Sequence, residues 1–241
     1  MTKVGFISLG CSKNLVDTEV MLRKLYDAGF EITPDETEAE IIVINTCGFI
    51  ESAKKEAIDN ILDAERLKEW GKCKHIIATG CLVERYGEEV MRELPELDAI
   101  VGVGSLAHIA EACSAVMRGE KFVSLCDKEK APLGGDRIIT TEPHTAYLKI
   151  SEGCDNLCTY CAIPLIRGRH RSRPIEDIVA EARDLEGMGV KELNLIAQDT
   201  TRYGMDLYGK KCLPDLLHEL AKIPGIYWIR ILYCYPEEIT D

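Results

Sequence analysis

Short apolar runs alternate with helical segments through the first half of the chain. Each run is four to six residues long, too short for a typical helix and characteristic of a strand buried on both faces. The runs cover residues 4–9, 41–44, 75–79, 99–102 and 122–125, and helical segments cover residues 14–28, 52–69, 83–94 and 106–117. Strands and helices in this alternation form a parallel sheet covered by helices. We therefore predict an α/β fold, with a doubly wound parallel-sheet domain over residues 1–126.

The alternation is interrupted between residues 127 and 145, where prolines, glycines and charges accumulate. Such a composition predicts a linker. The pattern then resumes, with strands expected at residues 146–150, 192–197 and 226–232, and helices at 175–188 and 213–223. Residues 146–241 should therefore form a second domain made of three strand–helix steps.

Composition is typical of a soluble globular protein, with 46% hydrophobic and 29% charged residues in a chain of 241. No apolar run is long enough to predict a membrane span. The first residues also lack the basic and apolar regions of a secretion signal. The eleven cysteines are an odd number. Without an export signal, they indicate a reducing compartment rather than a disulfide framework, and we expect the cytoplasm.

Net charge is −12, divided as −8 over residues 1–141 and −4 over residues 142–241. Nucleic-acid-binding proteins usually concentrate positive charge, because they must neutralise phosphates. Acidity in both halves of this chain weighs weakly against an RNA substrate.

The most specific chemical pattern is a group of three cysteines within eight residues. Cys154, Cys158 and Cys161 directly follow a predicted strand. Thiolates at this spacing can face one soft metal centre, and three protein ligands leave one iron of a [4Fe–4S] cluster open to a small molecule. A zinc site or a chance group of buried thiols is the alternative. Zinc sites usually pair CxxC units or add histidines, and the sequence shows no such partner nearby.

A second set of three cysteines is dispersed along the first domain. Cys11, Cys47 and Cys81 each come one to three residues after a predicted parallel strand, and Gly10, Gly48 and Gly80 border them. Loops at the carboxyl ends of such strands converge on one crevice, so these thiols could surround a second metal centre. The remaining cysteines lack this placement and are predicted to be packing residues; they are Cys73, Cys113, Cys126, Cys212 and Cys234.

The spacing of Cys154, Cys158 and Cys161, with Tyr160 just before the third, resembles the cluster motif of radical S-adenosylmethionine (radical SAM) enzymes. With both cysteine sets, the whole chain resembles the methylthiotransferases of that superfamily. The resemblance implies that residues 146–241 are the first half of a partial (β/α) barrel, and that the rest of the barrel and a C-terminal TRAM domain are absent. It also implies two [4Fe–4S] clusters and S-adenosyl-L-methionine as cofactors. One cluster would generate a 5′-deoxyadenosyl radical, and the other would hold the sulfur to be transferred.

Methylthiotransferases have two main branches. One modifies an isopentenyl- or threonylcarbamoyl-adenosine of tRNA, and the other modifies the β-carbon of an aspartate in small-subunit ribosomal protein S twelve. The sequence phrases at residues 10–17, 45–53 and 162–168 resemble the ribosomal-protein branch. This branch is the prediction, with that ribosomal protein as substrate, a flavodoxin- or ferredoxin-like electron donor and a separate sulfur donor as partners. The tRNA branch is the alternative; from another class, a non-enzymatic iron–sulfur carrier or scaffold is also open.

Several other residues have candidate roles within the resemblance. Tyr160 is expected beside the adenine of S-adenosylmethionine, and Gln198 beside its amino end, although Gln198-Asp199-Thr200 could instead be a turn or a helix cap. Arg230 is a guess for the barrel interior, where it would need a partner. A basic run could receive an acidic substrate side chain or nearby RNA; it comprises Arg167, Arg169, His170, Arg171 and Arg173.

Overall fold

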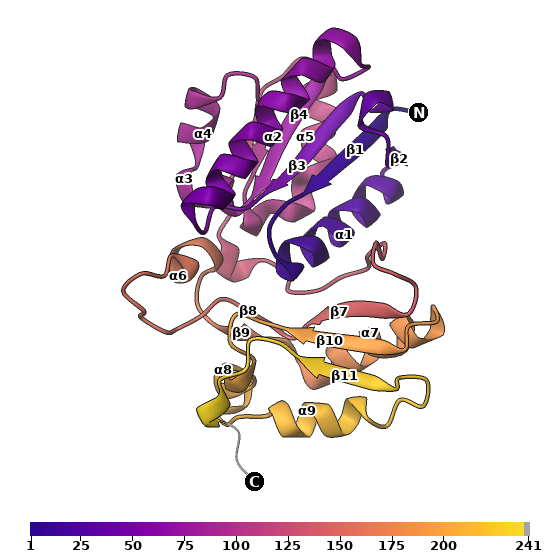
Figure 1. The fold of residues 1–241 in the computed structure, drawn as a ribbon, viewed down its shortest axis with the longest axis vertical. Coiled ribbons are helices and arrows are strands. Elements are labelled where there is room, and N and C mark those ends of the chain that lie inside the picture. The colour runs from indigo at the N-terminus through magenta and orange to yellow at the C-terminus, as the bar shows by residue number, and fades with distance from the viewer. Residues whose placement is uncertain (239–241) are drawn as a thin grey trace. The chain divides into compact units, whose positions relative to one another are not determined.

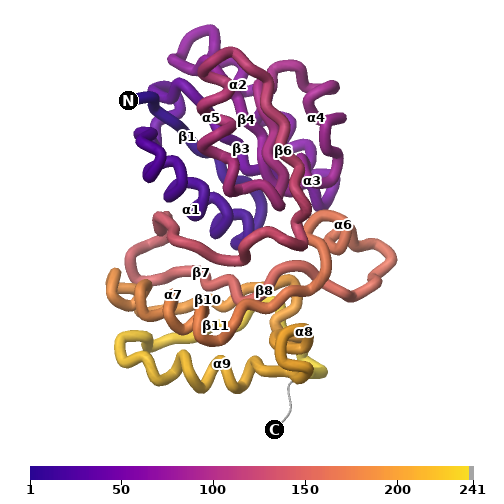
Figure 2. The backbone as a smooth tube through the Cα atoms, turned by 180° about the vertical axis from the view of Figure 1, so that it is seen from behind, coloured from indigo at the N-terminus to yellow at the C-terminus, as the bar shows by residue number. Residues whose placement is uncertain are grey.

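The structure is a computed structural model and describes residues 1–238 (Figure 1; Figure 2). The chain forms two compact units. Unit 1 comprises residues 1–131 and 135–138, and unit 2 comprises residues 132–134 and the chain from residue 139 onward. No helix among the described residues combines the length and the apolar character needed to cross a membrane. The finer division into residues 1–126, 127–145 and 146–241 stays a prediction.

Unit 1 contains a six-stranded sheet in which every pair of neighbouring strands is parallel, in the order β2-β1-β3-β4-β5-β6. The strands are β1 (Lys3–Ser8), β2 (Glu31–Thr33), β3 (Ile41–Thr46), β4 (His75–Gly80), β5 (Ala99–Val101) and β6 (Phe122–Ser124). The helices are α1 (Ser12–Asp27), α2 (Glu51–Trp70), α3 (Cys81–Tyr86), α4 (Glu88–Glu93) and α5 (Ile109–Met117), with 3-10 turns η1 (Glu36–Glu38), η2 (Val103–His108) and η3 (Lys128–Lys130).

Strand β3 shows how the sequence pattern produces two packed faces. All six of its residues are buried. Ile42 and Ile44 pack in a cluster with α2, α3 and α4, whereas Ile41 and Val43 pack in another cluster with α1 and α5. Because successive side chains of a strand point to opposite faces, a continuous apolar run requires helices on both sides. The predicted doubly wound α/β fold is confirmed.

The strand order also creates a switch point in unit 1. From β1 the chain crosses to β2 on one side and then returns to β3 on the other. In open α/β sheets, the loops at such a point leave a crevice beyond the carboxyl ends of the strands. Cys11 follows β1, and Cys47 follows β3, the two strands that flank this point.

Two predicted helices of unit 1 differ in detail. The segment expected at 83–94 is divided into α3 and α4 at Gly87, whose φ of 57° is left-handed and cannot continue a helix. The segment expected at 106–117 begins as the 3-10 turn η2 before α5. Strand β2 was not predicted, because it has three residues at the sheet edge and none of them is buried.

Unit 2 contains a parallel sheet in the order β11-β10-β7, built from β7 (Thr145–Lys149), β10 (Glu192–Ile196) and β11 (Trp228–Ile231). Helices α7 (Ile175–Gly187) and α9 (Leu213–Leu220) bury one face of it around Leu148, Leu193 and Leu195. The three predicted strands and the two predicted helices that connect them are therefore confirmed. The smaller elements are β8 (Ser151–Glu152), β9 (Arg171–Ser172), α6 (Ile163–Arg167), α8 (Met205–Tyr208), η4 (Thr200–Arg202) and η5 (Pro236–Glu238).

Candidate iron–sulfur and cofactor sites

The first cysteine set lies at the carboxyl ends of three adjacent strands in unit 1. Cys11 caps the start of α1, Cys47 follows β3, and Cys81 is the first residue of α3, directly after β4. The strand register aligns these ends, since Ser8 pairs with Asn45 and Thr46 pairs with Gly80. The sheet thus brings together three loops that are far apart in sequence.

Backbone contacts confirm that these loops touch. A Cβ added to Gly10 would lie 2.9 Å from Cys47 Cβ and 3.1 Å from Cys47 Sγ. A Cβ added to Gly48 would lie 2.7 Å from Leu82 Cα and 3.0 Å from the carbonyl carbon of Cys81. Gly10 also has a φ of 89°, which favours glycine. The Cys11 loop therefore packs on Cys47, and the Cys47 loop packs on the start of α3.

Three buried polar atoms around this first set lack hydrogen-bond partners in the structure. They are Ser12 Oγ, Asn45 Oδ1 and Thr79 Oγ1. Each lies one or two residues from a cysteine of the set. Buried polar atoms are normally paired, so this group of orphans fits a site that is completed by a bound polar or ionic group.

The second cysteine set lies on the loop that follows β8 in unit 2. Cys154 is 9% exposed, Cys161 is half-buried and Cys158 is exposed. The Cys154 N–H donates to the Gly168 carbonyl at 3.1 Å, and the Cys161 N–H donates to the Cys158 carbonyl at 3.0 Å. A Cβ on Gly153 would lie 2.0 Å from the Arg169 carbonyl oxygen, so only glycine fits this approach. The start of the loop is thereby fixed while its tip stays accessible.

Electrostatics favour a cation at the second set. Burial raises the pKa of the Cys154 thiol, and negative charge on Asp199, Cys161 and Cys158 raises it further, while the Asn156 N–H acts in the opposite direction. That N–H donates to Cys154 Sγ at 3.4 Å. Three neighbouring thiolates repel one another, so a metal centre is the natural way to hold all three deprotonated.

Neither set is arranged as a finished metal site. Within residues 1–238, no group of three or more His, Cys, Asp or Glu side chains has the geometry to hold a metal ion. The donor type, three thiols in each set, and the contacts of their loops nevertheless fit iron–sulfur clusters. The assignment of these six ligands stays a prediction.

A buried charge network is centred on Glu152, two residues before Cys154 in the sequence. Glu152 Oε2 accepts from Lys149 Nζ at 2.9 Å and from an Arg167 guanidinium nitrogen at 3.3 Å, and Glu152 Oε1 accepts from Gln198 Nε2. Lys149, Glu152 and Arg167 are all buried. Burial alone would raise the pKa of Glu152, but the cations of Lys149 and Arg167 lower it to about 2. The carboxylate therefore remains charged at neutral pH.

Replacing Glu152 by Gln should destabilise unit 2 strongly. The change would deprive two buried cations of their shared carboxylate, and breaking a buried ion pair in this way costs roughly 3–5 kcal/mol. Urea unfolding of Glu152→Gln measures the loss. The matched control is Glu192→Gln, which removes a pair with Arg230 at 2.9 Å in which the Arg230 side chain is 55% exposed. Similar losses in both variants would contradict the role assigned to the buried network.

Gln198 has one satisfied and one orphaned polar atom. Its amide nitrogen donates to Glu152, whereas its Oε1 is buried without a hydrogen-bond partner. Ser151 Oγ is buried and orphaned as well. An acceptor with these properties fits an ammonium donor such as the amino group of S-adenosylmethionine. Asp199, by contrast, caps η4 by accepting from the Thr201 N–H at 3.1 Å.

Tyr160 is 85% exposed, so it is not a core aromatic, and its predicted contact with adenine stays a prediction. A cavity of about 560 Å³ lies beside the same loop. Cys158, Asn156, Asp199 and Tyr235 contribute to its lining. A small polar molecule could therefore reach Cys158.

The prediction that the basic run is a receptive surface loop is wrong for three of its residues. Arg167, His170 and Arg173 are buried. Arg173 contacts Glu181 at 2.6 Å, and His170 Nε2 lies 3.2 Å from Ser172 Oγ. Glu152 pairs with Arg167 and Glu181 pairs with Arg173, which offsets the cost of burying these two guanidinium groups. Only Arg169 of the run is exposed.

Arg230 lies on β11 in register with Asn194. Asn194 alternates along β10 with Leu193 and Leu195, which belong to the helix-covered core. Arg230 therefore occupies the opposite sheet face, where it is exposed and pairs with Glu192.

The packing interpretation of the other cysteines is right for Cys73, Cys113 and Cys212, which are buried. Burial raises the pKa of Cys73 to about 11 and that of Cys113 to about 12, so both thiols remain protonated and unreactive. The interpretation is wrong for Cys126, which is exposed, and incomplete for Cys234, which is half-buried.

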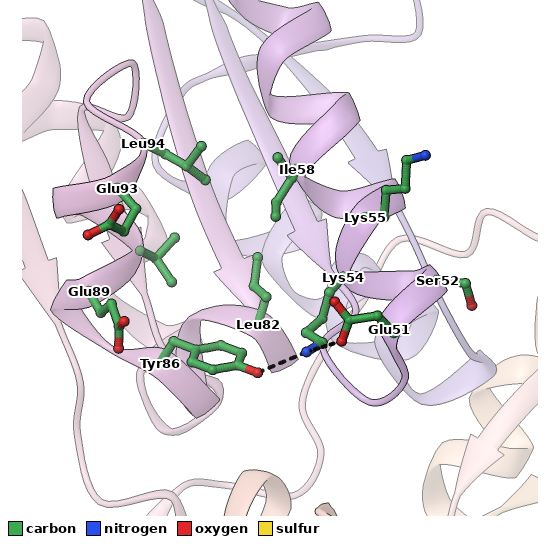
Figure 3. A pocket seen from close by; sticks show the side chains of 11 residues that line it. Glu51, Ser52, Lys54, Lys55, Ile58, Leu82, Tyr86, Glu89, Glu93 and Leu94 are labelled. Atoms are coloured by element: carbon green, nitrogen blue, oxygen red, sulfur yellow. Dashed lines mark hydrogen bonds and ion pairs between the residues drawn. The ribbon is translucent and has the colours of Figure 1, made fainter.

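Unit 1 also has a groove of about 690 Å³ between α2 and the pair α3 and α4 (Figure 3). Ile58 and Leu94 lie on its opposite walls, and Leu82 lies between them. At one end Lys54 donates to the Tyr86 hydroxyl at 3.2 Å and pairs with Glu51. None of the six candidate cysteines is among the residues that line it. The groove is therefore separate from the predicted cluster site.

Two family models match the chain. Residues 3–102 match "Uncharacterized protein family UPF0004", and residues 148–237 match "Radical SAM superfamily". Among solved structures, the radical S-adenosylmethionine methyltransferase TsrM from Kitasatospora setae has a TM-score of 0.58 at 12% identity, covering 91% of this chain and 50% of that one. This likeness concerns the fold alone. The family model and the cysteine loop that it contains together indicate a radical SAM domain over residues 148–237.

Curated relatives with similar sequences share one printed name. A Symbiobacterium thermophilum protein named "Ribosomal protein uS12 methylthiotransferase RimO" is 53% identical over 240 residues, 99% of this chain and 50% of the relative. A Clostridium tetani protein of the same name is 51% identical over 245 residues, 100% of this chain and 54% of the relative. The chain spans about half the length of the curated relatives it matches. Over nearly its whole length the chain is similar to proteins of this name, and its match to the radical SAM model lies in residues 148–237.

Sequence reasoning missed three groups that the structure places around the cysteines. Asn14 contacts all three loops of the first set, and Lys149 and Glu152, which precede the second set in the sequence, build the charge network. Asn14 lies within the same phrase as Cys11, and Glu152 precedes Cys154 by two residues. These residues could have been found as polar residues close to a candidate cysteine ligand, in segments otherwise expected to be buried.

Proposed function

We propose that this protein is a radical SAM methylthiotransferase that modifies the β-carbon of an aspartate in small-subunit ribosomal protein S twelve. The proposal rests chiefly on the two sets of three cysteines, one on each unit. The printed name of the curated relatives, which specifies uS12, supports the substrate. The acidic charge of both halves of the chain agrees with a protein substrate rather than tRNA.

Cys11, Cys47 and Cys81 would hold one [4Fe–4S] cluster, and Cys154, Cys158 and Cys161 would hold the other. When bound, the clusters and S-adenosyl-L-methionine supply the radical hydrogen abstraction and the methylthio group that an unactivated C–H bond requires. The protein's own residues bind and orient these groups. Gln198 Oε1 would accept from the amino group of S-adenosylmethionine, and Tyr160 would cover its adenine.

Glu152 would orient Gln198 for this contact. Its carboxylate accepts from the Gln198 amide nitrogen, which turns the amide oxygen away from Glu152 and leaves it as the acceptor. Lys149 and Arg167 keep Glu152 ionised, so it cannot donate a proton in place of accepting one. The buried network thereby sets which end of the Gln198 amide is offered.

A protein that works in this way needs two partners besides its substrate. An electron donor such as a flavodoxin or ferredoxin would reduce the cluster at Cys158, which is the exposed cysteine of the second set. A separate sulfur donor would resupply the first set. The cysteine content of the chain agrees with a reaction in the reducing environment of the cytoplasm.

Mass spectrometry of cells with and without the gene for this chain tests the substrate. We expect the ribosomal protein to carry one aspartate heavier by roughly 46 Da, the replacement of H by SCH₃, only when the gene is present. Adenosines of tRNA should be the same in both strains. The same mass difference on tRNA adenosine, with the ribosomal protein unchanged, would favour the tRNA branch instead.

A further inference from the structure

Asn14 is the residue on which the three loops of the first cysteine set converge. It lies in the first turn of α1 and is fully buried. Its Nδ2 donates to the Leu9 carbonyl and to the Thr46 carbonyl, both at 3.0 Å. Its Oδ1 accepts from Cys81 Sγ at 3.5 Å. One amide therefore contacts the segment before Cys11, the residue before Cys47, and Cys81 itself.

Further hydrogen bonds fix Asn14 from beneath. Asn45 Nδ2 donates to the Asn14 carbonyl at 2.8 Å and to Thr18 Oγ1 at 3.0 Å. Thr18 Oγ1 in turn lies 2.9 Å from Ser8 Oγ. These side chains come from β1, α1 and β3, so the network joins the elements from which the loops start. Inside a protein such a network holds its members in one arrangement.

The amide group suits this position for a chemical reason. The Leu9 and Thr46 carbonyls need two N–H donors, and one side-chain amide provides both at one place. The contact with the Cys81 thiol belongs to the metal-free chain, because a cluster ligand is a thiolate and has no S–H to donate. The three cysteines lie on three separate crossovers, so no local segment fixes their spacing. A residue that joins all three loops can preorganise them and reduce the ordering needed when a metal centre binds.

We propose that Asn14 is a positioning residue for the first cysteine set, holding the Cys11, Cys47 and Cys81 loops at the spacing that a cluster requires. This inference rests on the proposed function, because it assumes that these three cysteines bind iron. It adds a residue that does not touch the cluster but acts through the loops. Changes to partners of this kind typically lower metal affinity roughly 10–100-fold.

The test isolates the first set by replacing Cys154, Cys158 and Cys161 with Ala in the 241-residue chain. After anaerobic reconstitution with iron and sulfide, this background protein should hold about four Fe. Adding Asn14→Asp preserves the shape of the side chain but removes both N–H donors. We expect cluster affinity, measured by competition with an iron chelator, to fall roughly 10–100-fold. The electron paramagnetic resonance spectrum of the remaining reduced cluster should also change.

Two controls separate positioning from general stability. Asn60→Asp makes the same change on α2, where the amide donates only to the Glu56 carbonyl of its own helix at 2.8 Å. Cys113→Ala removes a fully buried core side chain of α5 that is not part of the network around Asn14. Both controls should retain the affinity and spectrum of the background protein. Melting temperatures of the iron-free proteins are measured in parallel.

The outcomes are distinct. Retained affinity and spectrum in Asn14→Asp would overturn the proposal. So would equal losses in Asn14→Asp and Cys113→Ala that follow their losses of melting temperature, because Asn14 would then be an ordinary core residue. A background protein without iron, although folded, would overturn the assignment of Cys11, Cys47 and Cys81 itself. A loss of iron in Asn14→Asp alone would establish the positioning role.

Discussion

Replacing Cys154, Cys158 and Cys161 together by alanine is expected to halve the iron content of the reconstituted protein. With two [4Fe–4S] clusters, the unaltered chain should hold about eight Fe, and the variant about four. The three residues lie on one loop, so their removal leaves the sheet of unit 1 and its cysteine loops untouched. Iron and acid-labile sulfide analysis of anaerobically reconstituted protein gives the result directly.

A control with the same number of substitutions uses cysteines outside both sets. Cys73 and Cys212 are buried, and Cys126 is exposed. Replacing these three by alanine should leave about eight Fe per chain, because none is a predicted ligand. If the variant without Cys154, Cys158 and Cys161 also keeps all its iron, those residues are not the ligands of a cluster. A loss of half the iron in the control would show that at least one of Cys73, Cys126 and Cys212 is a cluster ligand.

The large elements were predictable because burial on both sides of a sheet leaves a direct mark on the sequence. Strand β3 is a continuous apolar run whose alternate residues enter two different cores. The two-residue strands β8 and β9 leave no such mark. They exist because Ser151 pairs with Ser172 and Glu152 with Arg171 across the cysteine loop, and such a pairing depends on the tertiary fold. Short elements of this kind cannot be predicted from local periodicity.

The candidate sites show the same division between local and distant causes. The spacing of Cys154, Cys158 and Cys161 is a local motif, and the placement of Cys47 after β3 follows from strand order. Burial of Arg167 and Arg173 was not predictable, because their carboxylate partners Glu152 and Glu181 lie on other elements, β8 and α7, and only the tertiary fold brings each pair together. A run of basic residues is therefore expected to be exposed to solvent unless the structure shows carboxylates that pair with it.

The two cysteine sets are expected to fail differently when each is broken alone. Cys11→Ala should abolish methylthio transfer to the ribosomal protein but still permit reductive cleavage of S-adenosylmethionine to 5′-deoxyadenosine. Cys158→Ala should abolish both reactions. The reason is that the two sets lie on separate units. Cys158 and Asp199 line a cavity that a small molecule can enter. Cys11 lies instead at the switch point of the unit 1 sheet.

Chromatographic measurement of 5′-deoxyadenosine, together with mass analysis of the ribosomal protein, separates the two reactions in one incubation. Cys126→Ala provides the matched control, since it removes an exposed thiol of unit 1 that belongs to neither set, and both products should persist. Equal loss of S-adenosylmethionine cleavage in Cys11→Ala and Cys158→Ala would contradict the separation of roles. Because cleavage needs only an open iron and an electron, its survival in Cys11→Ala would locate that chemistry at the second set and leave sulfur delivery to the first.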